Sequence, residues 1–169
     1  APGDRLIALP ASGPHSNGYS LIRKVLASCG ATLETRVEGR TLEEILLAPT
    51  RLYVREVLAL LAAGSSVRGI AHITGGGLTE NIARVLPEGC GATLERECWT
   101  PPPIFEWLKS NGGLTDEEMY RTFNCGIGMT LTIPSEESTA CLATLADAGI
   151  AAFDVGVIEA RPQPTVTIR

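Results

Sequence analysis

The feature that most constrains the fold is a regular alternation of short apolar runs and helical patterns. The runs at 5–10 (RLIALP), 67–73 (VRGIAHI) and 126–133 (GIGMTLTI) have the length and composition of buried strands. Apolar residues recur at helical spacing over 19–30 and 135–149, and no internal repeat is present. A chain of this length with this alternation predicts a single α/β domain, with helices on the two faces of a mixed sheet.

Other segments refine this expectation. Further strands are predicted at 90–95, 153–160 and 165–168, and Thr-x-x-Glu capping boxes at Thr41 and Thr115 predict two helix starts. Residues 31–40 look irregular. The segment after Pro49 (TRLYVREVLALLAAG, 50–64) reads as a long, largely buried helix that ends at Gly64. The helix after the second strand should bury one apolar stripe, made of Leu78, Ile82, Val85 and Leu86.

Charge and composition exclude several classes of function. The chain has 14 basic and 19 acidic side chains and a net charge of -5, so its overall field does not attract nucleic acid or anionic lipid. No apolar run has the length of a membrane span, and the first residues do not resemble a secretory leader. We therefore expect a cytoplasmic protein without a nucleic-acid or membrane partner.

The cysteines and the amino-terminal residue support two further expectations. Five cysteines without a C-x-x-C pair argue against a disulfide framework and a zinc site, which leaves reduced thiols and no metal site. The chain starts at Ala1 rather than methionine and enters a strand within a few residues, so we interpret it as a possible fragment of a longer protein.

The strongest candidate site is the segment AHITGGGLTENIARVL (71–86), which has three glycines between a strand and a helix. Glycines let the backbone approach a ligand, and the first N–H groups of a helix favour an anion such as phosphate. Neither standard nucleotide fingerprint is satisfied, because Glu80 stands where G-x-G-x-x-G needs its last glycine and no G-K-[ST] follows. A tight turn with close helix-to-sheet packing would explain the same glycines, and spacing alone leaves both interpretations open.

A second polar loop, SGPHSNG (12–18), lies at another strand-to-helix junction. It resembles the G-x-S-x-G elbow of serine hydrolases, but Pro14 replaces the first glycine and no acid and base partners follow, so we reject that activity. The loop offers hydroxyls, an imidazole and backbone N–H groups that suit an anion or a sugar. Residue pattern alone favours a simpler role, in which Ser16 or Asn17 caps the helix.

The third candidate is the segment NCGIG (124–128). Cys125 could be a nucleophile with one of the two histidines, but a cysteine that opens an apolar strand is more typical of a small buried side chain. Gly126 and Gly128 indicate a bulge or the close approach of a ligand or another chain segment, and Asn124 could place an amide at the edge. The Glu43–Glu44 and Glu117–Glu118 pairs fit first helical turns and do not indicate catalytic carboxylates.

Taken together, these segments closely resemble one family. The stretches are GDRLIALPASGPHSNGYSLIRKVL, LLAPTRLYV, IAHITGGGLTENIARVLP, FEWL and EEMYRTFNCGIGM, in this order along nearly the whole chain. They resemble the C-terminal domain of the phosphoribosylformylglycinamidine cyclo-ligases, or AIR synthetases, of purine biosynthesis. Residues 31–40 and the last few residues do not share the resemblance.

The resemblance implies an activity and a fold. The family closes the imidazole ring of 5-aminoimidazole ribonucleotide from formylglycinamidine ribonucleotide, with ATP and Mg²⁺; ATP would phosphorylate the formyl oxygen, and attack by the amidine-side nitrogen would then expel phosphate. The implied C-terminal domain is a three-layer α/β/α sandwich around a mixed β-sheet. Full-length members have two α/β domains and are expected to be homodimers.

The amino-terminal domain, which would carry acidic Mg²⁺ ligands and much of the ATP site, is absent from residues 1–169. We therefore expect this chain to be inactive alone and to form one wall of a cleft for a phosphorylated ribonucleotide. The glycine loop would bind the substrate phosphate, and His15 or His72 would orient the formyl or amidine group. The expected substrate-binding residues are Ser12, His15, Ser16, Asn17, Thr74, Gly75, Gly76, Gly77, Asn81 and Asn124.

Two alternatives remain open. Other ATP-using enzymes of the same superfamily share this arrangement: selenophosphate synthetases, thiamine monophosphate kinases and the formylglycinamidine ribonucleotide amidotransferase. These relatives do not share the sequence motifs GPHSNGYSL and NCGIGM. The alternative of a different class is a non-catalytic ligand-binding or interaction domain that kept the scaffold.

Overall fold

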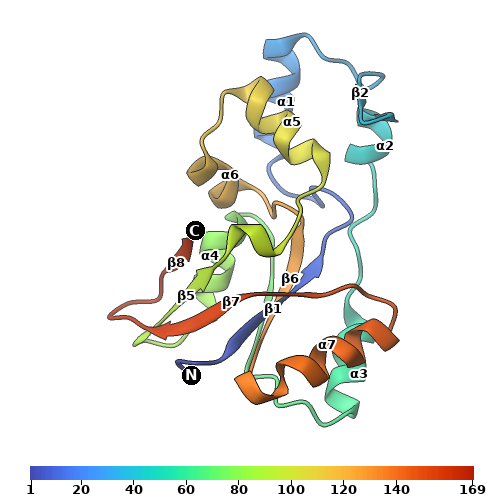
Figure 1. The fold of residues 1–169 in the computed structure, drawn as a ribbon. Coiled ribbons are helices and arrows are strands. Elements are labelled where there is room, and N and C mark those ends of the chain that lie inside the picture. The colour runs from blue at the N-terminus through green and yellow to red at the C-terminus, as the bar shows by residue number, and fades with distance from the viewer.

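The fold, described over residues 1–169 by a computed structural model, is built on a six-stranded mixed sheet (Figure 1). The strand order is β4-β6-β1-β7-β5-β8, in which only the β5–β8 pair is parallel. Its strands are β1 (Arg5–Pro10), β4 (Gly69–His72), β5 (Cys90–Leu94), β6 (Ile127–Ile133), β7 (Phe153–Ala160) and β8 (Val166–Ile168). The strands and the mixed sheet predicted from the apolar runs are confirmed.

Four helices begin or end at the capping and glycine signals in the sequence. Capping boxes at Thr41 and Thr115 start α2 and α6, and left-handed glycines at Gly30 and Gly113 end α1 and α5. The helices are α1 (Tyr19–Cys29), α2 (Leu42–Leu46), α3 (Val54–Ala62), α4 (Gly77–Arg84), α5 (Pro103–Gly112), α6 (Asp116–Thr122) and α7 (Ser138–Asp147). Short 3-10 turns lie at Arg96–Cys98 and Ser135–Glu137.

Both faces of the sheet are covered, because side chains of β1 alternate between two cores. Leu6 and Ala8 belong to the larger core, to which α1, α4, α5 and α6 contribute. Ile7 and Leu9 face the smaller core, to which α3 and α7 contribute. Figure 1 shows α3 and α7 together on one side and the other helices on the opposite side, with α1 and α5 extending beyond the sheet. The expected three-layer α/β/α sandwich is confirmed.

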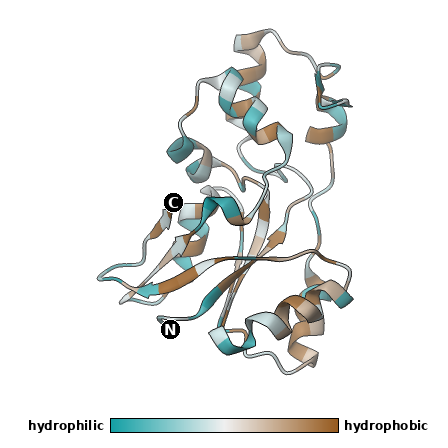
Figure 2. Ribbon diagram, in the orientation of Figure 1, coloured by the Kyte–Doolittle hydropathy of each residue, from teal (hydrophilic) through white to brown (hydrophobic).

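Three local expectations are wrong. Residues 31–40 are not wholly irregular, because β2 (Arg36–Val37) pairs with β3 (Arg40–Thr41). The helix expected over 50–64 starts only at Val54, and most of its side chains are not buried: Leu58 is 58% exposed although α3 is hydrophobic along most of its length (Figure 2). Val85 is exposed as well, because α4 ends at Arg84 and the chain turns before Leu86.

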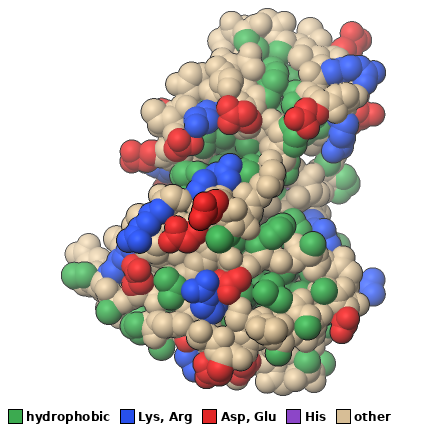
Figure 3. Space-filling model, in the orientation of Figure 1, with side chains coloured by type: hydrophobic (Ala, Val, Ile, Leu, Met, Phe, Trp, Pro, Cys, Tyr) green, Lys and Arg blue, Asp and Glu red, His purple; other side chains and the backbone are tan.

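The surface shows no concentration of one charge sign on the face drawn in Figure 3, where acidic and basic side chains are interspersed. Several of them form pairs, such as Arg5 with Asp154 at 2.7 Å and Lys109 with Asp116 at 2.8 Å. None of the helices combines the length and the apolar composition that a membrane crossing requires.

Candidate functional site

The three candidate loops meet at one edge of the sheet. β1 and β4 both run antiparallel to β6 and flank it on either side. The carboxyl ends of β1 and β4 therefore lie beside the amino end of β6. This arrangement brings together the loop after β1 (11–18), the loop after β4 (73–76) and the loop before β6 (123–126).

Buried side-chain amides join these loops to one another. Asn17 donates from Nδ2 to the carbonyl of Ile73 at 3.2 Å, which ties the first loop to the second. Asn124 donates from Nδ2 to the carbonyl of Gly13 at 2.9 Å, and its Oδ1 accepts from the N–H of Gly126 at 2.9 Å. Both asparagines are buried, so these bonds fix the relative positions of the loops.

Asn81 organises the glycine loop from within. Its Nδ2 lies 2.8 Å from the carbonyl of Gly77, 3.1 Å from that of Thr74 and 3.2 Å from that of Gly75. Its Oδ1 accepts from the Thr74 hydroxyl at 3.0 Å. Because these bonds use its whole amide, Asn81 shapes the loop and its side chain does not project into open space.

The three glycines of this loop have different surroundings. Gly75 is exposed, and a Cβ there would meet no atom within 4 Å. Gly76 is the residue before α4 and has φ 98°. Gly77 is buried with φ 59°, and a Cβ there would overlap backbone atoms of Tyr120 and lie 2.8 Å from the Phe123 carbonyl oxygen. Close packing therefore explains Gly77, whereas Gly75 is open to solvent.

The start of α4 also has free backbone donors. The N–H groups of Gly75, Gly76, Leu78 and Thr79 have no backbone acceptor, as expected for a first helical turn. The Glu80 side chain folds back over Gly76, with Cδ 3.0 Å from the position of a Cβ there. A carboxylate of the chain therefore lies against the helix start, where the sequence analysis places a substrate phosphate.

His15 is held in a buried position. It has φ 57°, in the left-handed region, and is only 5% exposed. Its Nε2 accepts from the N–H of Ser12 at 3.2 Å, while its Nδ1 is buried without a partner. Burial, and secondarily the nearby His72, lowers the pKa of His15 to about 4, so the ring is neutral at neutral pH.

His15 and His72, the two catalytic candidates, lie in one aromatic cluster with Tyr53. Ring centroids are 6.5 Å apart between His15 and His72, 6.4 Å between His15 and Tyr53, and 6.1 Å between Tyr53 and His72. The Tyr53 hydroxyl donates to the carbonyl of Pro10 at 2.9 Å, and burial raises its pKa to about 12. His72 is exposed at the end of β4.

Tyr53 also belongs to this cluster, although the sequence pattern over 50–64 predicts a helix there and does not single it out. It precedes α3 and ends the α2–α3 connection (residues 47–53). The signal was present in Gly128: a Cβ there would overlap the Tyr53 hydroxyl and lie 2.7 Å from Cε1 of His15. The close approach of a chain segment that Gly128 indicated is therefore confirmed, and the segment is this tyrosine with His15.

Two cavities flank the α2–α3 connection. One of about 500 Å³ is lined by His15, Ser16, Tyr19 and residues 46–50. The other, of about 360 Å³, contains Tyr53 and His72 among mostly apolar residues of the connection, α3, β4 and β6. Ser12 lies near the first cavity, where its hydroxyl donates to the carbonyl of Pro49 at 2.7 Å.

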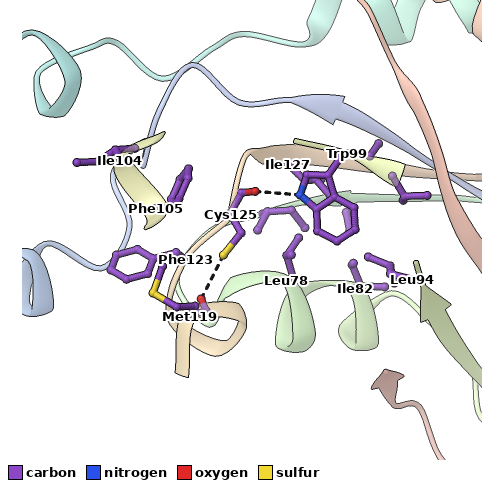
Figure 4. Close-up of a cluster of buried hydrophobic side chains, with 14 of the residues drawn as sticks. Leu78, Ile82, Leu94, Trp99, Ile104, Phe105, Met119, Phe123, Cys125 and Ile127 are labelled. Carbon is purple, nitrogen blue, oxygen red and sulfur yellow. Dashed lines mark hydrogen bonds between the residues drawn. The ribbon is translucent and has the colours of Figure 1, made fainter. Parts of the chain in front are cut away.

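Cys125 is buried, as expected from its place before a strand. It is 3% exposed, its Sγ lies 3.6 Å from the carbonyl of Met119, and its own carbonyl accepts from Nε1 of Trp99 at 3.0 Å (Figure 4). Burial raises the pKa of the Cys125 thiol to about 12, which keeps it protonated.

No group of three or more His, Cys, Asp or Glu side chains gathers in a way that could hold a metal ion.

Comparison with known proteins identifies relatives of this chain. The phosphoribosylformylglycinamidine cyclo-ligase of Methylobacillus flagellatus is 47% identical over 161 residues, which cover 95% of this chain and 46% of that enzyme. The solved structure of tt0281 from Thermus thermophilus covers the whole chain with a TM-score of 0.58 and 24% identity, and 50% of tt0281 is matched. A hydrogenase maturation protein HypE in complex with ATP aligns with 99% of the chain and 48% of its own length at a TM-score of 0.61 and 16% identity.

The chain thus spans about half the length of the relatives it matches. The family model described as "AIR synthase related protein, C-terminal domain" matches residues 1–169. The chain belongs to this family of AIR synthase related C-terminal domains.

Proposed function

We propose that this chain is the C-terminal half of an ATP-dependent cyclo-ligase that converts formylglycinamidine ribonucleotide to 5-aminoimidazole ribonucleotide, with ATP hydrolysed to ADP and phosphate. The observation that carries the proposal is the 47% identity to a phosphoribosylformylglycinamidine cyclo-ligase over 95% of the chain. The cytoplasmic location expected from the sequence and a homodimeric full-length enzyme are part of the same proposal.

The loop cluster would form one wall of the substrate cleft. The free N–H groups of Gly75 and Gly76 at the start of α4 would bind the substrate phosphate, and Glu80 would have to move aside for it. Thr74 and Ser16 would supply hydroxyls, while the hydrogen-bonded amides of Asn17, Asn81 and Asn124 would hold the loops in place. Gly13 and Gly77 would support this wall through close backbone packing, and Ser12 through its hydrogen bonds to His15 and Pro49.

The two histidines would have different roles. His72 is exposed beside the glycine loop and could contact the formyl or amidine group directly. His15 is neutral, and its Nδ1 has no hydrogen-bond partner. This nitrogen would form a hydrogen bond with the ligand or with His72. Tyr53 would position both rings through the cluster.

ATP and Mg²⁺ would bind mainly through an amino-terminal domain that residues 1–169 do not include. In support, a HypE with the same fold is described in complex with ATP. The side chains of this chain do not gather into a group that fits Mg²⁺. When bound, ATP supplies the activation of the formyl oxygen, and the residues named above bind and orient the ribonucleotide.

The test is a cyclisation assay with formylglycinamidine ribonucleotide, ATP and Mg²⁺. The protein would be a chimera that joins the amino-terminal half of the Methylobacillus flagellatus enzyme to residue 1 of this chain. We expect 5-aminoimidazole ribonucleotide from the chimera and none from the 169-residue chain. A folded chimera that transfers the γ-phosphoryl group of ATP to another acceptor, or that makes no 5-aminoimidazole ribonucleotide, would refute the proposed reaction.

A further inference from the structure

An apolar surface without a covering element lies beside the candidate site. Four exposed hydrophobic side chains, Leu52, Val54, Leu58 and Ile70, line the cavity of about 360 Å³ that also contains Tyr53 and His72. Leu52 is 80% exposed and Val54 62%. We call this surface the α3–β4 face.

The concentration of apolar side chains here is unusual for this chain. Among the large hydrophobic residues that are exposed, only Leu33 and Val85 lie outside residues 47–61 and β4. The single ionic side chain of the cavity is Arg51, which lies 3.7 Å from Glu56 and is partly neutralised by it. An exposed patch of this kind marks an interaction site, and its low charge fits an apolar partner surface.

The same face ends in an open sheet edge. β4 is the outermost strand beside β6, and Ile73, directly after β4, donates to the carbonyl of Gly128 at 2.9 Å. Because pairing alternates along an antiparallel ladder, the N–H and C=O groups of Ile70 and His72 point away from the sheet. The face therefore offers apolar side chains and backbone groups that could pair with an added strand.

The candidate site adjoins this face, whereas the chain start is linked to the residue before β4 only through side chains. His72 belongs to the edge strand, to the cavity and to the aromatic cluster at once. Ala1 binds Asp4 through its amino group at 2.5 Å, and Asp4 accepts from Arg68 at 2.6 Å, one residue before β4. The backbone of Gly3 and Asp4 pairs with Ile158 of β7, so a polypeptide segment that precedes residue 1 would enter the fold at the amino end of β1, with β6 between it and β4.

We propose that the α3–β4 face is the surface on which the amino-terminal half of the full-length enzyme packs. The proposal rests on the proposed function in one respect, namely that this chain works together with such a half. The relatives are about twice as long as this chain, which supplies a covalently linked partner of domain size. Docking there would place the partner's residues next to His72 and exclude water from the cavity.

Hydrogen exchange on the chimera described above and on the 169-residue chain tests this proposal. We expect the amides of Ile70 and His72 and those at the start of α3 to exchange at least about tenfold more slowly in the chimera. Leu58→Glu and Ile70→Lys should abolish this protection, while the matched changes at exposed sites elsewhere, Leu33→Glu and Val85→Lys, should leave it intact. Amides in the cores report whether each variant is folded.

Three results would overturn the proposal: equal exchange in the chimera and the chain, protection that survives Leu58→Glu and Ile70→Lys, or protection of the isolated chain that grows with its concentration. The last result would assign the face to a second copy. Failure of the proposed reaction is recognised separately, because a chimera with a protected face and no cyclisation product retains the docking surface and loses only the function.

Discussion

Two strand-to-helix junctions, β1 to α1 and β4 to α4, have the same backbone conformation before the helix but differ in which residues are exposed to solvent. Each helix is preceded by a left-handed glycine without a side-chain cap, Gly18 with φ 71° and Gly76 with φ 98°. The first junction buries its polar residues His15 and Asn17, whereas the second leaves Gly75 and its free N–H groups accessible. The comparison shows that the same left-handed glycine can precede a helix whose junction is largely buried or one that is open to solvent.

The cause of the difference lies in the elements that cover each junction. The α2–α3 connection crosses the first junction, where Ser12 binds Pro49 and the Tyr19 hydroxyl binds the carbonyl of Leu46. In the second junction Gly77 packs against backbone at the end of α6, Gly76 meets only the side chain of Glu80, and Gly75 is open. We therefore expect substitutions in the second junction to range from strongly destabilising to neutral within three residues.

The largest effect is expected for Gly77→Ala. The new Cβ would overlap the backbone of Tyr120 in a left-handed conformation, so both sterics and backbone strain oppose it. We expect the free energy of unfolding to fall by about 4 kcal/mol, measured by urea denaturation. The control Gly75→Ala has open space and should change it by less than about 0.5 kcal/mol. Equal losses at the two positions would contradict the division between packed and open glycines.

A smaller loss is expected for Gly128→Ala, which disturbs the contact between the first junction and Tyr53. Its Cβ would meet side-chain atoms of Tyr53 and His15 rather than backbone, so the neighbours can shift at a cost of about 2 kcal/mol. In a Tyr53→Phe background the same change should cost less, because the overlapping hydroxyl is gone. A double-mutant cycle by thermal denaturation measures this coupling, and strictly additive costs would speak against it.

Acidification should destabilise the first junction through His15. The pKa of His15 is about 4 in the folded chain and near 6.5 when unfolded, so between these values only the unfolded state binds the proton. The free energy of unfolding should therefore fall as the pH drops from 6.5 towards 4, by about 3 kcal/mol. Urea denaturation across this range measures the loss.

The matched control is His15→Asn, because asparagine tolerates the left-handed backbone and does not titrate. This variant should lose less stability between pH 6.5 and pH 4 than the parent chain does. If both lose the same amount, another group accounts for the acid sensitivity.

The smallest effect is expected for Glu80→Gln at the second junction. Removal of the carboxylate over Gly76 should strengthen the binding of inorganic phosphate by about twofold to fivefold, because a negative charge leaves the helix start. Phosphate titration followed by the NMR shifts of the Gly75 and Gly76 amides measures the change. Glu88→Gln removes the same charge beyond the other end of α4, and an equal gain there would indicate a general charge effect only.

Local signals predicted most elements correctly because they act over a few residues. The capping boxes at Thr41 and Thr115 and the glycine stop at Gly30 placed helix ends, and the run at 5–10 placed the central strand. The start of α3 could not be predicted in this way. Residues 50–53 have a helical sequence pattern, but they belong to the α2–α3 connection. Within this connection the Tyr53 ring lies beside the ring of His15.

The sequence by itself determined the alternation of strands and helices and the identity of the candidate loops, because apolar periodicity, caps and glycines are local properties of the chain. Its resemblance to known members over nearly the whole chain gave the family. Tertiary structure alone decided which glycine is packed, that the amides of Asn17, Asn81 and Asn124 hold the loops, and that His15 is buried and neutral. It also left the α3–β4 face uncovered. Apart from the bonds of Asn81 within its own loop, these properties depend on contacts between segments far apart in the chain, which no local pattern encodes.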